Sequence, residues 1–249
     1  MDYASDYYES AEGALCLLTE HYGRPGEPLF NQDEVKRLCG TKNAALDEAM
    51  RRIQLPKRRR ALDLGCAVGG AIFGLRRYFD RAVGIDRSPL LLTHARDLQR
   101  ERETTVVWAS EGLPLRPYLI RLPDDAVTDE IEFLEGDLNA LPPALGLFDL
   151  VMTEKVPECL PDLRHFLAQI PGLVASGGYF MHVSSYRWHA HFTAPEKQLG
   201  SPGQVPAQLD EILGPSMRRE DRFNVPFILT NDAAGFSFGV SEALLWKRR

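Results

Sequence analysis

The sequence predicts an α/β protein whose core is a mostly parallel β-sheet. Short apolar segments alternate with amphipathic segments from residue 60 to about residue 185, and this alternation is typical of a doubly wound parallel sheet. Two later β-rich segments, 227–230 and 238–246, are separated by a turn at 231–235. They predict an antiparallel hairpin that closes the sheet. The length of 249 residues suits one such domain.

The first 55 residues predict helices. One apolar helical face, at intervals of three and four residues, is formed by Ala11, Leu15, Leu18 and Tyr22. Gly23 and Pro25 follow as a stop signal. A second helical stretch, which begins with a capping-box pair, is marked by Asn31, Glu34, Ala45, Ala49 and Ile53. We therefore divide a single domain, 1–249, into a helical lid, 1–55, and a cofactor-binding sheet, 56–249.

The region from residue 56 predicts five parallel strands and three helices before the closing hairpin. The strands are expected at 61–64, 82–85, 131–134, 148–152 and 179–183, and the helices at 71–78, 89–100 and 163–170. Residues 103–130 interrupt the alternation with an insertion that is rich in proline and acidic residues.

The charge balance makes nucleic acid an unlikely partner. The chain has 29 lysine and arginine residues against 35 acidic residues, a net charge of −6, whereas nucleic-acid-binding domains are usually basic. One basic cluster lies within residues 51–60. Solvated charges beside a buried strand are the commoner explanation for such a cluster. An RNA-directed enzyme that uses this cluster is the alternative.

The sequence contains no metal-binding or membrane-spanning pattern. The four cysteines, Cys16, Cys39, Cys66 and Cys159, are far apart and form no zinc-type spacing. No apolar run approaches the ~20 residues of a membrane span, and the first ten residues are too polar for a signal peptide. We therefore expect a cytoplasmic protein with no metal and no membrane partner, and its oligomeric state stays open.

A cofactor loop is predicted where the first strand meets its helix, in the segment Ala61–Gly70. Its sequence, ALDLGCAVGG, ends a strand in small residues, which would let a ligand lie against the backbone. The next strand ends in Asp86, 21 residues after Gly65, where a carboxylate can accept both hydroxyls of a ribose. The third strand ends in Gly136-Asp137-Leu138, where an acid and backbone amides can bind an adenine.

S-adenosylmethionine fits this pattern better than a dinucleotide. A dinucleotide loop needs Gly-x-Gly-x-x-Gly around its pyrophosphate, but Gly65-Cys66-Ala67-Val68-Gly69-Gly70 lacks the second glycine. Asp63 would repel a pyrophosphate, whereas it suits the sulfonium and ammonium of S-adenosylmethionine. The candidate cofactor residues are Asp63, Gly65, Cys66, Ala67, Gly69, Asp86, Arg87, Ser88, Asp137, Leu138 and Thr153.

These motifs resemble the class I methyltransferases over about residues 55–185. The resemblance implies a Rossmann-like sheet of seven strands whose last strand is antiparallel, which agrees with the predicted closing hairpin. The loop, the ribose acid and the Gly-Asp pair indicate the cofactor rather than the substrate.

The segment after the fourth strand, 152–161, differs from nucleic-acid methyltransferases. Enzymes that methylate exocyclic amines of bases carry Asn/Asp-Pro-Pro-Tyr/Phe there, and this tetrapeptide is absent. Cys159 follows Glu158 rather than a proline, so the Pro-Cys nucleophile of cytosine-carbon methylation is absent too. Cys159 is therefore predicted to be a small buried hydrophobic side chain.

A closer resemblance covers nearly the whole chain. The segments that carry it include Tyr8-Glu9-Ser10, His21-Tyr22-Gly23, Leu62–Gly69, Ser184–Trp188 and Val240-Ser241. They are similar to the methyltransferase domain at the carboxyl end of ovothiol synthases, which methylates an imidazole nitrogen of a thiohistidine. The chain departs from that family at His189-Ala190-His191 and at Glu242. The resemblance therefore implies a chalcogen-substituted imidazole, thiohistidine or its selenium analogue.

The resemblance and the residue types suggest a substrate site for a small zwitterion. Tyr8, Tyr186 and Trp188 can enclose a flat ring, and Arg187 or Lys155 can meet a carboxylate. The candidate bases that remove a ring proton are Glu154 and Glu242. His182 lies in a predicted strand and is expected to be structural.

Positioning decides which substrate atom can react. A thiolate or selenolate is a better nucleophile than a ring nitrogen, so methylation on nitrogen requires the pocket to aim that nitrogen at the methyl group. A non-catalytic module that binds the cofactor and regulates a partner is a further alternative.

Overall fold

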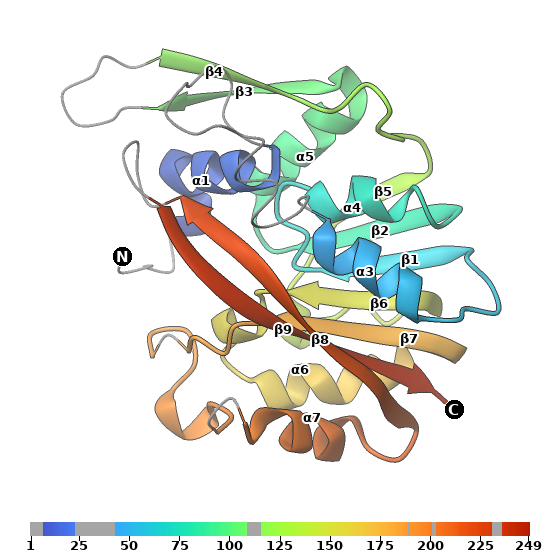
Figure 1. Ribbon diagram of the computed structural model, residues 1–249. Coiled ribbons are helices and arrows are strands. Elements are labelled where there is room, and N and C mark those ends of the chain that lie inside the picture. The colour runs from blue at the N-terminus through green and yellow to red at the C-terminus, as the bar shows by residue number, and fades with distance from the viewer. Residues whose placement is uncertain (1–6, 23–42, 109–115, 189, 201–202, 231–235) are drawn as a thin grey trace.

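The computed structural model describes residues 7–22, 43–108, 116–188, 190–200, 203–230 and 236–249 (Figure 1). The predicted capping pair Asn31 and Glu34, the stop signal Gly23 and Pro25, and the turn 231–235 lie outside the described residues. No helix formed by the described residues is long and apolar enough to cross a membrane.

A seven-stranded sheet forms the centre of the structure, in the order β5-β2-β1-β6-β7-β9-β8. Its strands are β1 (Arg60–Leu64), β2 (Arg81–Asp86), β5 (Ile131–Glu135), β6 (Phe148–Glu154), β7 (Val174–Ser184), β8 (Met217–Thr230) and β9 (Phe236–Arg248). The first five are parallel, whereas β9 runs antiparallel to both β7 and β8. The predicted fold class, a mostly parallel sheet with an antiparallel last strand, is confirmed.

Helices cover both faces of the sheet (Figure 1). One face packs against α1 (Ala11–Tyr22), α3 (Ala44–Arg52), α4 (Gly70–Leu75) and α5 (Pro89–Glu101). The other face packs against α6 (Leu163–Gln169) and α7 (Val205–Leu213). The described residues also form short 3₁₀ helices before or between these elements: η1 (Tyr7–Glu9), η2 (Leu138–Ala140), η3 (Pro157–Cys159), η4 (Ile170–Gly172) and η5 (Pro195–Lys197).

Local signals fix the start of the helices nearest the site. Ser88 caps α5, because its Oγ accepts a hydrogen bond from the Leu91 backbone N at 3.1 Å, and Pro89 follows as the first helical residue. Asp162 caps α6 in the same way by accepting from His165 N at 3.0 Å. These caps set both helices at the carboxyl edge of the parallel strands.

The structure corrects three details of the sequence-based prediction. The insertion 103–130 contains a β-hairpin, β3 (Glu103–Trp108) and β4 (Arg116–Arg121), which forms a separate two-stranded sheet beside α1 and α5. The helix predicted at 71–78 ends at Leu75, after which the backbone N of Arg77 and of Tyr78 bond to carbonyls three residues back. Helix α7 was not predicted, although Val205, Leu209 and Leu213 mark one buried helical face.

Candidate functional site

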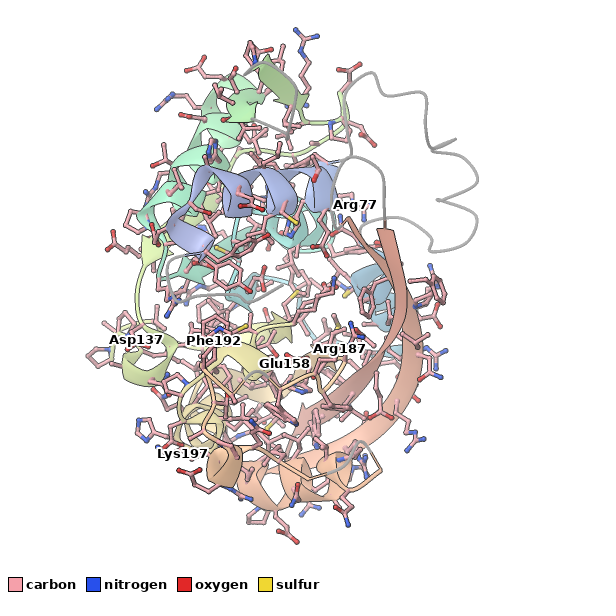
Figure 2. The ribbon with its side chains drawn as sticks, turned by 90° about the vertical axis from the view of Figure 1, so that its left-hand side faces the viewer. Arg77, Asp137, Glu158, Arg187, Phe192 and Lys197 are labelled. Carbon is pink, nitrogen blue, oxygen red and sulfur yellow. The ribbon has the colours of Figure 1, made fainter. Side chains whose placement is uncertain are left out.

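The carboxyl edge of the sheet brings the predicted site residues together. Strands β1, β2, β5, β6 and β7 all end at this edge, and Glu242 of β9 lies there because it pairs with Ser184 at the end of β7. Figure 2 views the molecule from this edge, with Asp137, Phe192, Glu158 and Arg187 between the α1–α5 layer and the α6–α7 layer. Ligands of open α/β sheets bind at such an edge.

The glycine loop between β1 and α4 turns sharply. Gly65, Ala67 and Gly69 have φ values of 86°, 47° and 82°, and Gly65 N and Cys66 N both donate to the Ile85 carbonyl, at 2.8 and 3.1 Å. Contact with a ligand was the expected reason for the missing side chains. The structure gives another reason: a Cβ at Gly65 would overlap with Val156, and one at Gly69 would lie 2.9 Å from the Phe133 ring. The glycines are therefore needed for backbone conformation and packing.

Two predicted cofactor residues direct their side chains into the protein interior. Cys66 is 1% exposed, and burial raises the pKa of its thiol well above the ordinary value. Thr153 is fully buried, with its Oγ1 3.3 Å from Nδ1 of His182. Only the backbone of these two residues can therefore face a ligand at the edge.

Asp86 connects the end of β2 to the glycine loop. Its Oδ2 accepts from Ala67 N at 2.8 Å, and its Oδ1 accepts from Ser88 N at 2.9 Å. Burial raises the pKa of Asp86, although these backbone hydrogen bonds and the Arg87 charge oppose the rise. Arg87 is exposed and Ser88 is fully buried. The carboxylate keeps lone pairs for further donors, as a ribose ligand requires.

Three carboxylates gather where β1, β2 and β6 end. Asp63 is 3% exposed, and its pKa is raised well above the ordinary value by burial and by the charges of Glu154 and Asp86. The adjacent Lys155 forms an ion pair with Glu20 of α1. This group of carboxylate acceptors disfavours a phosphate and fits a cofactor that carries a sulfonium and an ammonium group.

We predict that Asp63 makes cofactor affinity depend on pH. Because the pKa of Asp63 is raised in the folded protein, the folded state keeps this proton to a higher pH than the unfolded state does. The stability of the folded state therefore falls as the pH rises from the unfolded-state pKa of Asp63 to its folded-state pKa. A bound cation favours the ionised form, so the affinity for S-adenosylmethionine should rise with pH across the same window and then become constant. Asp63→Asn should remove this rise, weaken binding at neutral pH and stabilise the free protein.

Titration calorimetry between about pH 5 and about pH 8, together with urea unfolding, measures these effects. Asp149→Asn is the control, because Asp149 lies at the start of β6, at the opposite edge. A wild-type affinity that does not change with pH, or an Asp63→Asn protein that binds as tightly as wild type, would contradict the prediction.

The predicted adenine contacts lie beyond β5. Asp137 is exposed and caps η2, since its Oδ1 accepts from Asn139 N at 2.9 Å. Leu138 is 6% exposed, and its carbonyl accepts from Gln169 Nε2 at 3.1 Å, which leaves its backbone N as the group available to a base. Their part in adenine binding stays a prediction.

Tyr8 bridges the cofactor side and the substrate side of the edge. Its carbonyl accepts from Ser88 Oγ at 3.1 Å, its hydroxyl lies 3.6 Å from Cys159 Sγ, and its ring lies 6.2 Å from that of Phe192. Burial raises the pKa of Cys159 to about 11, so this thiol stays protonated at neutral pH. Cys159 is half-buried rather than buried as predicted, and its protonated thiol does not favour a nucleophilic role.

Tyr186 is held in an unusual backbone conformation just after β7. Its φ is 55°, rare for a bulky residue, and its N donates to Ser184 Oγ at 2.9 Å and to Glu158 Oε1 at 3.2 Å. Its hydroxyl donates to Glu242 Oε2 at 2.9 Å, and its ring stacks on His182, with centroids 6.3 Å apart. Residues fixed against backbone strain cluster at functional sites.

His182 supports this arrangement from inside the sheet. It is 1% exposed, and burial lowers the pKa of its imidazole to about 3, so the ring is neutral. This agrees with the expected structural role.

The remaining predicted substrate residues differ in their surroundings. Arg187 is exposed and lies at the edge (Figure 2). Trp188 is half-buried, and its Nε1 finds no acceptor among the described residues. Lys155 was predicted as a possible carboxylate ligand, but its ammonium already pairs with Glu20 and lies 4.4 Å above the Phe227 ring. Lys155 is therefore unavailable in this arrangement.

Glu158 lies at the site although it was not among the candidate site residues predicted from the sequence. It is 4% exposed in η3, and its Oε1 accepts from Ser184 Oγ at 2.7 Å and from Ser185 N at 3.0 Å. An acidic residue within the apolar run Val156–Leu160 was a visible signal. No three histidine, cysteine or acidic side chains among the described residues are arranged as metal ligands.

The C-terminal end of α1 is hydrogen-bonded to the glycine loop and the start of α4. His21 Nδ1 accepts from Gly70 N at 3.1 Å, and the Tyr22 hydroxyl donates to the Val68 carbonyl at 2.8 Å. Burial raises the pKa of Tyr22 well above its ordinary value, so the hydroxyl remains a donor. The amino-terminal segment is thus a part of the cofactor edge.

The sheet order, the antiparallel β9 and the acid-rich glycine loop together define the Rossmann-like fold of class I methyltransferases. The solved structure of the N-methyltransferase NodS from Bradyrhizobium japonicum WM9, in complex with S-adenosyl-L-homocysteine, has this fold. It aligns with a TM-score of 0.55 and 16% identity over 98% of this chain and 99% of that chain.

Sequence comparison locates the domain within the chain. Residues 62–182 match the family described as "Methyltransferase domain". The chain is 26% identical over 150 residues to "Probable tocopherol O-methyltransferase, chloroplastic" of Oryza sativa subsp. japonica, an alignment that covers 60% of this chain and 34% of the relative. It is 31% identical over 91 residues to the phthiotriol/phenolphthiotriol dimycocerosates methyltransferase of Mycobacterium tuberculosis, covering 34% of this chain and 33% of the relative.

The aligned segments span about a third of these curated relatives. Residues 62–182 thus match a methyltransferase domain, and the sheet that carries them has the fold of class I methyltransferases, which agrees with the predicted cofactor, S-adenosylmethionine.

Proposed function

We propose that the protein is an S-adenosylmethionine-dependent N-methyltransferase of a small imidazole substrate, thiohistidine or its selenium analogue. The resemblance of its sequence to the methyltransferase domain of ovothiol synthases supports the substrate class. The acid-rich edge and the tyrosines beside it support a small ring that carries N–H groups.

One observation carries the proposal: the 2.9 Å hydrogen bond between Tyr186 and Glu242. The two residues come from different segments and meet at the edge where the cofactor loop lies. An aromatic ring joined to a carboxylate offers a flat wall and an acceptor for a ring N–H, which are the features that a neutral imidazole needs.

The bound cofactor supplies an electrophilic methyl group on its sulfonium. The residues of the chain then have to hold the ring nitrogen in line and keep the more nucleophilic chalcogen out of line. Tyr186 and Trp188 fix the ring plane in this scheme. Glu242 takes the ring proton, with Glu154 as the second candidate base.

The amino-terminal segment 1–55 serves as the lid of this site. Tyr8 touches both the Ser88 hydroxyl and Cys159, and α1 binds the glycine loop. A lid of this kind excludes water and completes the site.

The RNA-directed alternative receives no support from the basic segment 51–60. Arg51 and Arg52 form ion pairs with Glu48, and Arg52 also pairs with Asp221. Arg60 lies over the Phe148 ring at the start of β1, at the edge opposite the site. RNA bound to this segment would lie away from the cofactor edge.

The identity of the product tests the proposal. The purified protein with S-adenosylmethionine is expected to convert thiohistidine or selenohistidine to a monomethylated product, whose methyl group heteronuclear NMR places on a ring nitrogen. Plain histidine should react poorly, because it lacks the chalcogen that orients the ring.

Three results would contradict the proposal: a methyl group on sulfur or selenium, equal turnover of plain histidine, or cofactor binding without turnover of any histidine derivative. The last result would favour a non-catalytic module. Salt-sensitive RNA binding would favour the RNA-directed alternative.

A further inference from the structure

The two oxygens of the Glu158 carboxylate have unequal surroundings. Oε1 accepts hydrogen bonds from Ser184 Oγ at 2.7 Å, Ser185 N at 3.0 Å and Tyr186 N at 3.2 Å. Oε2 is buried as well, but no donor of the described residues reaches it. Buried polar atoms nearly always have a partner, so an orphaned carboxylate oxygen calls for a ligand.

The neighbouring charges do not satisfy this oxygen. Lys155 is close enough for Glu158 to contribute to the rise in its pKa, but its ammonium bonds to Glu20. Burial is the largest cause of the raised pKa of Tyr186, Glu242 and Glu158 add to it, and Arg219 opposes it. Arg222 Nε lies 3.6 Å from Glu242 Oε1, so this cation is paired with Glu242, whereas no donor of the described residues reaches Oε2 of Glu158. A buried carboxylate oxygen without a paired charge is stabilised by a cation.

Glu158 also stands between the two walls of the substrate site. On one side its Oε1 fixes the segment that carries Tyr186, and on the other side its chain neighbour Cys159 contacts the Tyr8 hydroxyl. Figure 2 shows Glu158 at the middle of the carboxyl edge, between Phe192 and Arg187 in the view.

We propose that Oε2 of Glu158 binds the α-ammonium group of the substrate, so that Glu158 selects amino acids over imidazoles that lack the amine. This inference rests on the proposed function, because it assigns one group of that substrate to one residue. Oε1 keeps its present bonds, and the ammonium adds the partner that Oε2 lacks. No covalent step is involved.

Glu158→Gln tests the assignment, because an amide oxygen can still accept the bonds to residues 184–186 while the charge is lost. The substrates are thiohistidine and its des-amino analogue, a thioimidazole propionate. The wild-type KM should be about 10- to 100-fold higher for the analogue. In Glu158→Gln the KM of thiohistidine should rise to that of the analogue, whose own KM stays the same. Affinity for S-adenosyl-L-homocysteine should not change, and the melting temperature should not fall, because the substitution removes a buried charge and keeps the bonds of Oε1.

Ser184→Ala is the matched control for a merely structural role. Ser184 Oγ donates to Oε1 and accepts from Tyr186 N, so alanine removes bonds that hold Glu158 and Tyr186 together but changes no contact of Oε2. It should alter the KM of both substrates by the same factor. If Glu158→Gln behaves like Ser184→Ala, Glu158 only holds residues 184–186 in place, and its assignment to the substrate ammonium is wrong.

Failure of the proposed function gives a different result. If wild type turns over thiohistidine and its analogue with equal KM, the function stands and the Glu158 assignment falls. If the wild-type enzyme turns over neither thiohistidine nor its analogue, the proposed function is wrong. The assignment of Glu158 to an ammonium group is then tested by ligand binding to the protein loaded with S-adenosyl-L-homocysteine. Histamine should then bind more tightly than imidazole, and Glu158→Gln should remove the difference. Equal binding overturns the assignment.

Discussion

Asp86→Ala is expected to weaken the binding of S-adenosylmethionine by about 10- to 100-fold. Asp86 ends β2 at the carboxyl edge, and its two oxygens already hold Ala67 N and Ser88 N in place. Alanine would remove the charged acceptor for the ribose hydroxyls and also the link between the loop and β2. The loss of hydrogen bonds to a charged group costs about 1.5–3 kcal/mol, which corresponds to this change in the dissociation constant.

Asp149→Ala provides the control for this experiment. Oδ2 of Asp149 accepts from the backbone N of Arg59 at 2.8 Å and of Arg60 at 3.1 Å, so alanine removes a similar pair of backbone contacts. It lies at the amino end of β6, away from the cofactor edge, and should reduce stability without changing cofactor affinity. Calorimetry that finds unchanged affinity in a folded Asp86→Ala protein would overturn the assignment of Asp86 to the ribose.

Tyr186→Phe and Glu242→Gln are each expected to lower kcat about 100-fold and to leave cofactor affinity unchanged. The expectation comes from orientation, because a misplacement of about 1 Å at the reacting atoms can cost a factor of this size. The two residues share one hydrogen bond, so the double variant should be little worse than either single variant.

A second tyrosine–glutamate pair on the same sheet serves as the control. The Tyr179 hydroxyl donates to Glu220 Oε2 at 2.6 Å, toward the other end of β7. Burial, together with the hydrogen bond to Glu220, raises the pKa of Tyr179 to about 12. Tyr179→Phe should leave turnover intact. If the Tyr179 and Tyr186 variants lose turnover equally, or if neither does, the 186–242 pair does not orient the substrate.

The cofactor half of the edge could be predicted because it is continuous in sequence. The loop 61–70 is one strand–turn–helix unit, and the position of Asp86 follows from the length of a single helix and strand. Parallel strands bring their carboxyl ends to one edge, so topology alone collects these residues. The reason for the glycines could not be predicted, because Val156 and Phe133 are distant in sequence.

The substrate half could be predicted only in part. Tyr186 and Glu242 were selected separately, but their contact depends on the register between β7 and β9, which no local pattern fixes. Glu158 was missed because its burial and its bonds to residues 184–186 depend on contacts between segments that are distant in sequence, although its place in an apolar run was a signal. The β3–β4 hairpin has an alternating pattern, with Thr104 and Val106 buried and Val107 exposed. The pattern was overlooked because the surrounding residues are rich in proline and acidic side chains.

The bonds between α1 and the glycine loop make the position of the loop depend on the amino-terminal helix. At its C-terminal end, α1 is bonded to the loop backbone through His21 and Tyr22. At the other end, the Tyr8 carbonyl accepts from Ser88 Oγ at 3.1 Å, and the Tyr8 ring lies 6.2 Å from that of Phe192. Between these ends, Ala14, Leu15 and Leu18 of α1 are buried in the core. The helix, the loop and the start of α5 are therefore stabilised together, so a change that loosens α1 would also loosen the loop backbone.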